Sequence, residues 1–272
     1  MIAPFVHVGR LFERPSAPDR GPRATTGSID DARDGSLVWA LAEAGLPVLD
    51  GVVVTRAGGP GREDVDGSEP SVADAAVHEA ITRLCPAPRE AVFLVTSIDG
   101  SLTRTARDTT VLAALRHADA ADMSLVRVVP DAVSSGSVTG RDPVTGADET
   151  VITAWWGVRG VVGADLHLAD APQENGEQRP DVVVLDEALV VVQRSTGHKT
   201  IALHPRGAML VPHEVNLFRR AAEIVDDDLA HELAMLVRHA SAATGRSLRL
   251  DWVVVDGQVS IIRAGDDQAL GR

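Results

Sequence analysis

Sulfur and aromatic rings are scarce in this 272-residue sequence, which has one cysteine, Cys85, no tyrosine and only 3% aromatic residues. A single cysteine excludes an internal disulfide and any zinc site built from several cysteines. The shortage of aromatic rings argues against a surface that stacks nucleic-acid bases. The core must therefore be built mainly from aliphatic side chains.

Long apolar runs are also missing. No stretch reaches the ~18 apolar residues that a membrane-spanning helix needs, and the N-terminal residues show no basic segment followed by an apolar one. We therefore expect a cytoplasmic protein without a membrane partner.

Positive charge is the third shortage, because 26 Lys and Arg residues face 39 Asp and Glu residues, for a net charge of −13. This excess opposes association with nucleic acid or an anionic membrane. It does not exclude ATP, since nucleotide sites use a few local cations and backbone N–H groups. With 44% apolar residues the chain is expected to fold, and its length allows two lobes.

Hydrophobic periodicity predicts a mixture of helices and strands. The strongest local signal is a hairpin that joins Arg249–Val255 to Val259–Arg263 across Asp256 and Gly257. The Ser-, Gly- and Thr-rich segment 134–146 is expected to form turns. Helices are predicted at 37–44, 72–84, 109–118 and 226–244, and strands at 5–11, 51–55, 91–96, 125–129, 151–155, 182–185 and 189–194.

Short motifs follow one another in a recognisable order. They are AGLPV at 44–48, GVVVT at 51–55, SGSVTGRDPVTG at 135–146, AWWG at 154–157, TGHK at 196–199 and the terminal hairpin. In this order they resemble the nucleotide-binding domain of the phosphoenolpyruvate synthase, pyruvate phosphate dikinase and rifampicin phosphotransferase family, the N-terminal PEP/pyruvate-binding domain. The resemblance spans about Asp34 to Ala264, and the shared order carries it, since each motif alone is weak.

The resemblance implies a two-lobed α+β protein with the ATP-grasp fold. Its first lobe would be a shortened segment 1–130, and its second lobe would be 131–272. The implied cofactor is ATP, with Asp142, Trp156 and Lys199 as nucleotide-binding residues. Without the resemblance, the same three residues would be a turn residue, a core residue and a solvated charge.

Most of the phosphate-handling positions implied by the resemblance carry other residues. Asp34 stands where the family has a phosphate-binding lysine, and segment 94–97 lacks the expected arginine. Asp251 occupies a metal-ligand position, but its partner position is Arg263. Because these two are near cross-strand neighbours, an ion pair between them is expected, and a Mg²⁺ site is disfavoured.

These departures favour a degenerate ATP-grasp relative that acts as a nucleotide-binding or regulatory module, and no catalytic residue is assigned. One alternative is an active ATP-dependent phosphotransferase (kinase) subunit of the pyruvate,water dikinase type, working with a separate phosphohistidine or phosphoenolpyruvate-binding partner. A further alternative is a structural partner protein that binds no nucleotide. Nothing in the sequence resembles the phosphohistidine domain, so catalysis by this chain alone is not expected.

Overall fold

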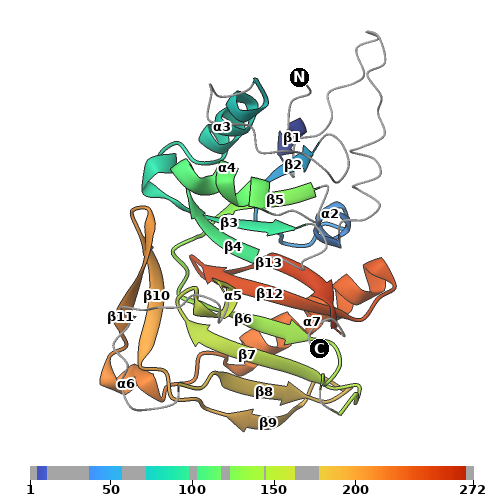
Figure 1. Cartoon of the computed structure of the whole chain (residues 1–272). Coiled ribbons are helices and arrows are strands. Elements are labelled where there is room, and N and C mark those ends of the chain that lie inside the picture. The colour runs from blue at the N-terminus through green and yellow to red at the C-terminus, as the bar shows by residue number, and fades with distance from the viewer. Residues whose placement is uncertain are drawn as a thin grey trace.

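The structure is a computed structural model that describes residues 5–10, 37–56, 72–97, 103–117, 123–143, 145–162 and 178–267. Its described strands form two antiparallel sheets and one separate hairpin (Figure 1). The first sheet has the order β1-β2-β5-β3-β4, with β1 Phe5–Arg10, β2 Val52–Arg56, β3 Val92–Ser97, β4 Thr103–Arg107 and β5 Met123–Val128. The chain is therefore an α+β protein.

The second sheet has the order β13-β12-β6-β7-β8-β9. Its strands are β6 Ser134–Thr139, β7 Thr150–Trp156, β8 Asp181–Leu185, β9 Val191–Ser195, β12 Leu248–Val255 and β13 Gln258–Asp266. The separate hairpin consists of β10 Ile201–Arg206 and β11 Met209–Glu214. The helices are α2 Leu37–Glu43, α3 Val72–Leu84, α4 Asp108–His117, α5 Arg159–Val162, α6 Leu217–Arg220 and α7 Asp227–Thr244, with a 3₁₀ turn η1 at Pro88–Glu90.

Helices α3 and α4 cover the face of the first sheet that is turned away from the second sheet (Figure 1). Val77 and Ile81 of α3 and Val111 of α4 are buried there against Val54 and Phe93. The opposite face carries Leu94, which packs in a separate cluster with residues of the second sheet. The predicted helix at 72–84 is thus confirmed, and its apolar spacing serves one face of one sheet.

Helix α7 covers one face of the second sheet and buries Leu233, Ala234 and Val237 against it. The side chain of Asp226 caps the helix by accepting a hydrogen bond from the Leu229 N–H at 2.8 Å. Gly245 ends it in the left-handed conformation, at φ 67°. Both helix ends agree with the sequence prediction.

The predicted terminal hairpin is also confirmed, since β12 and β13 pair antiparallel. Asp256 and Gly257 have φ values of 51° and 77°, as a tight two-residue turn of the right twist requires. The pairing contains a β-bulge beside Asp251, after which Trp252 is opposite Ile261.

The expectation of turns throughout 134–146 is wrong for its first half. Residues Ser134–Thr139 form β6, a fully buried strand between β12 and β7. Small residues are needed here because a Cβ on Gly136 would lie 1.8 Å from the Thr153 carbonyl oxygen and 2.8 Å from the Trp252 ring. Packing between neighbouring strands therefore overrides the local turn propensity of the segment.

The first half of the chain contributes to the second sheet and its core. Helix α2 buries Trp39 and Leu41 in the cluster around α7. Val48 then pairs parallel with Ile261, at the outer edge of β13. The described strands of the first sheet precede position 130, and those of the second sheet follow it. Helix α2 and Val48 precede position 130 but pack against the second sheet. The boundary between the two lobes therefore stays a prediction.

Among the described residues, no helix has the length and apolar character that crossing a membrane requires.

Candidate functional site

Asp251 lies on β12 of the second sheet, between β13 and β6, and is only 2% exposed. Its Oδ1 accepts a hydrogen bond from Arg249 Nε at 3.1 Å. Its Oδ2 is paired with the Arg263 guanidinium, which comes from the directly opposite position on β13. The ion pair expected from the sequence is thus present, and a second arginine joins it.

This arrangement does not fit Mg²⁺. The ion requires several oxygen ligands in octahedral geometry, usually carboxylates, phosphates and waters. Here both carboxylate oxygens of Asp251 face guanidinium groups. In the part of the chain that is described, no group of three or more His, Cys, Asp or Glu residues is arranged to hold a metal.

A row of polar side chains crosses the sheet from Asp251. Ser137 is opposite Asp251 on one side and Thr153 on the other. The hydroxyl oxygens of Ser137 and Thr153 are 2.9 Å apart and hydrogen-bonded. Because side chains alternate along β12, this row shares its face with Val253, which packs in the cluster containing Leu94 of the first sheet. The predicted site residue Asp251 therefore faces the first sheet.

Lys199 is completely buried, with an exposed fraction of 0%. Its Nζ forms an ion pair with Asp181 Oδ1 and donates to the Gly197 carbonyl oxygen at 3.3 Å. The same carboxylate accepts the Gly197 N–H at 2.8 Å and the Ile224 N–H at 2.9 Å. The lysine thus neutralises a buried carboxylate that ties three chain segments together, and it is not a surface charge.

Trp156 ends β7 and holds the short helix α6. Its indole N–H donates to the Arg219 carbonyl oxygen at 3.1 Å. The Arg219 guanidinium lies 4.0 Å from the ring centroid, in a cation–π contact. Lys199 reaches the same helix, because its backbone N–H donates to the Arg220 carbonyl oxygen at 3.1 Å. The structure therefore brings Trp156 and Lys199 together around α6.

Asp142 organises the loop that follows β6. Its carboxylate accepts from the Thr145 hydroxyl at 2.6 Å, and its carbonyl oxygen accepts from the Gly146 N–H at 2.8 Å. Asp142 is therefore a turn-forming residue, and its carboxylate is already engaged by the Thr145 hydroxyl.

The four predicted site residues do not converge on one point. Trp156 is opposite Ser134 at one end of β6, and Asp142 follows Thr139 at the other end. The six residues of β6 separate these ends by about 17 Å. Asp251 lies between them, opposite Ser137.

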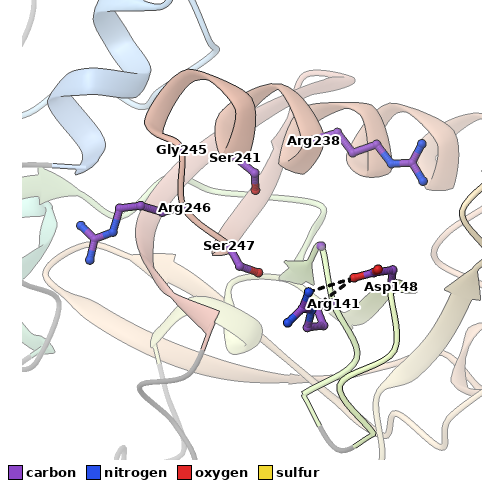
Figure 2. A pocket seen from close by; sticks show the side chains of 8 residues that line it. Arg141, Asp148, Arg238, Ser241, Gly245, Arg246 and Ser247 are labelled. Carbon is purple, nitrogen blue, oxygen red and sulfur yellow. Dashed lines mark hydrogen bonds and ion pairs between the residues drawn. The ribbon is translucent and has the colours of Figure 1, made fainter.

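A hollow of about 350 Å³ lies between the C-terminal end of α7 and the loop after β6 (Figure 2). It borders the Asp142 loop but contains none of the predicted site residues. The hydroxyls of Ser241 and Ser247 and the ion pair between Arg141 and Asp148 face it, whereas other arginine side chains at its rim extend away on either side (Figure 2). It lies on the α7 side of the sheet, opposite the Asp251 row.

Sequence reasoning missed Arg127, a buried cation of the first sheet. It lies on β5, and its cross-strand partner on β3 is Leu94, the first residue of segment 94–97, where the resemblance implied an arginine. It is 1% exposed, and its Nε donates to the Leu49 carbonyl oxygen at 3.0 Å, while its Nη1 donates to that of Ile262. Burial lowers the pKa of Arg127 to about 9, and Asp50 partly offsets this effect. The only signal in the sequence was a charged residue inside the apolar run 125–129.

Asp34, the position of the missing phosphate-binding lysine, lies outside the described residues.

No protein-family model matches the chain, and no curated protein matches it. Solved structures similar to it include D-alanine–D-alanine ligase from Bacillus anthracis, with 10% identity and a TM-score of 0.41. That match covers 83% of this chain and 53% of the ligase chain. The ADP complex of N5-carboxyaminoimidazole ribonucleotide synthetase has 13% identity and a TM-score of 0.37, and the match covers 83% of this chain and 42% of that one. The ATP-grasp ligase PsnB complexed with its minimal precursor has 12% identity and a TM-score of 0.36, and the match covers 89% of this chain and 55% of that one.

The chain thus spans about half the length of the structures that it resembles. The likeness is to the arrangement of an α+β fold seen in ATP-grasp structures. At these identities and TM-scores the likeness concerns the fold alone.

Proposed function

We propose that this chain is a non-catalytic ATP-grasp-type protein of the phosphoenolpyruvate synthase kind, serving as a cytoplasmic nucleotide-binding or regulatory module. The observation that supports this most directly is that the charges expected to handle ATP are neutralised within the protein. Asp251 is paired with two arginines, and Lys199 is paired with Asp181. Neither residue is left to bind a metal or a phosphate.

The chemistry of phosphoryl transfer explains why this loss matters. The transferred group needs cations against its oxygens and one or two Mg²⁺ ions held by carboxylates. Removing one preorganised charge contact typically costs ~3–4 kcal/mol of transition-state stabilisation. A chain in which the metal ligand and the lysine are both engaged elsewhere should therefore turn over no ATP.

Nucleotide binding without turnover needs fewer groups than catalysis. Backbone N–H groups and hydroxyls can hold a ligand, and the face of the second sheet that is turned toward the first carries the hydroxyls of Ser137 and Thr153. We therefore expect any ATP binding to be weak and independent of Mg²⁺.

The test is to measure the Tm of the purified chain with ATP, with and without Mg²⁺, together with ATP hydrolysis. We expect ATP to raise the Tm equally under both conditions, and hydrolysis to stay at background. Asp251→Ala serves as the site variant, and Asp148→Ala, whose side chain is 78% exposed, serves as a matched surface control.

Other outcomes lead to different functions. Hydrolysis that requires Mg²⁺ and disappears in Asp251→Ala but not in Asp148→Ala would contradict the proposal and favour an active phosphotransferase subunit. No change of Tm with ATP under either condition would favour a structural partner protein without nucleotide.

A further inference from the structure

The separate hairpin β10–β11, which stands beside the second sheet in Figure 1, carries two histidines on one face. His204 on β10 is opposite Val211, and His213 on β11 is opposite Ala202, so the two histidines are diagonal neighbours. Their ring centroids are 5.6 Å apart, and their ring planes are inclined to each other by 77°. The hairpin therefore holds two imidazoles side by side.

A carboxylate outside the hairpin orients the His204 ring. The Asp131 Oδ1 lies 2.8 Å from His204 Nδ1, and the Asp131 Oδ2 accepts a hydrogen bond from Arg206 Nη1 at 3.0 Å. The hydrogen bond with His204 lowers the pKa of Asp131, so the carboxylate is ionised near neutral pH and accepts the Nδ1–H. A neutral His204 then has its lone pair on Nε2.

The nitrogen atoms that a metal ion would use are not engaged elsewhere in the described part of the chain. There, neither His204 Nε2 nor the ring nitrogens of His213 have a hydrogen-bond partner. The His204 side chain is 24% exposed and His213 is exposed, so an ion can reach both rings from solvent. Neutral imidazole is the commonest metal ligand in proteins.

The distance between the rings suits one bridging ion. Zn²⁺ binds an imidazole nitrogen at ~2.0–2.1 Å, which places the ion ~3.2 Å from the ring centre. Two imidazoles on one tetrahedral ion therefore have centres ~5.2 Å apart, close to the 5.6 Å between His204 and His213. The exposed His213 ring can turn to direct a nitrogen at the ion.

We propose that His204 Nε2 and His213 bind a divalent transition-metal ion such as Zn²⁺, with Asp131 as the positioning residue of His204. A carboxylate that accepts the other ring N–H is the usual support of a ligating histidine. The site has two protein ligands, so it differs from the groups of three or more that the described residues lack, and it leaves coordination positions to water or a ligand. The inference does not depend on nucleotide binding.

The test is a calorimetric titration of Zn²⁺ into the full chain, purified without a histidine tag. We expect one saturable site, which His213→Asn should weaken at least about tenfold, since one imidazole then remains. Asp131→Asn should weaken it about 10- to 100-fold through the loss of the charged acceptor. The matched control is His231→Asn, which removes an exposed histidine of α7 and should leave Zn²⁺ binding unchanged.

Electron paramagnetic resonance of the Cu²⁺-loaded chain separates the ligands from the positioning residue. Cu²⁺ binds such sites more tightly than Zn²⁺, and its spectrum reports the nitrogen atoms bound to it. We expect two nitrogen ligands in the wild type and in Asp131→Asn, but one in His213→Asn. Because His213 is exposed, this variant should fold even if His204→Asn does not.

Several results would overturn the proposal. The absence of saturable Zn²⁺ binding by the wild type would refute the site. Binding that His213→Asn leaves unchanged, or that His231→Asn weakens equally, would show adventitious binding to surface histidines and refute it as well. The response of the Tm to ATP tests the proposed function separately, so either idea can fail while the other stands.

Discussion

The buried pair between Lys199 and Asp181 offers the sharpest test of whether the lysine is a structural residue or a nucleotide ligand. The Lys199 and Asp181 side chains are 0% and 4% exposed, so neither charge can be hydrated if its partner is removed. Breaking such a pair from one side typically costs ~3–5 kcal/mol. For a chain of this size, that corresponds to a Tm decrease of about 6–20 °C.

The structure also predicts which side of the pair is more costly to remove. In Lys199→Met the Asp181 carboxylate still accepts the N–H groups of Gly197 and Ile224. In Asp181→Asn the buried ammonium loses its counter-charge and retains only neutral acceptors, such as the Gly197 carbonyl oxygen at 3.3 Å. We therefore expect Lys199→Met near the lower end of the range and Asp181→Asn near the upper end.

Urea unfolding followed by tryptophan fluorescence measures both variants and the double variant. The double variant should cost less than the sum of the single variants, because the second change removes an already unpaired charge. Lys199→Met that loses less than about 1 kcal/mol of stability but loses ATP binding would refute the structural role and identify Lys199 as a nucleotide ligand.

Three further predictions concern other parts of the fold. Asp251→Asn should lower the free energy of unfolding in urea by about 2–3 kcal/mol. This is less than the loss of a fully buried pair, since the paired arginine side chains are 26% and 32% exposed. Arg263→Gln should create saturable Mg²⁺ binding in calorimetry, and equal binding by the wild type would contradict the metal-free interpretation. The hydrogen bond with His204 lowers the pKa of Asp131 in the folded protein. This carboxylate therefore stabilises the fold above its unfolded pKa of about 3.9, and the contribution is lost as the pH falls through its folded pKa. Acid unfolding of Asp131→Asn should depend less on pH than that of the wild type, and an unchanged profile would refute a stabilising role for Asp131. Gly157→Ala should lower the free energy of unfolding by at least about 2 kcal/mol, because the backbone φ is 65° and the added Cβ would lie 2.1 Å from a β10 carbonyl oxygen. A Tm in thermal unfolding equal to that of the wild type would contradict this close contact.

Local signals in the sequence were sufficient for elements that are specified by nearby residues. The helix 72–84 follows from its apolar spacing, and α7 follows from a capping aspartate and a terminal glycine. The Asp256-Gly257 turn made Asp251 and Arg263 predictable as near cross-strand neighbours, and the β-bulge beside Asp251 then places them directly opposite each other. In each case the interacting groups are within about a dozen residues of one another.

Tertiary structure alone decided the features in which distant residues meet. Segment 134–139 has the composition of a turn, yet it is a central strand because β12 and β7 enclose it, with no room for a Cβ at Gly136. The burial of Lys199 depends on a distant residue, since its partner Asp181 belongs to β8. Arg127 meets a carbonyl group 135 residues away. Charge in a folded protein is governed by burial and by the partner that burial brings near, and local sequence encodes neither.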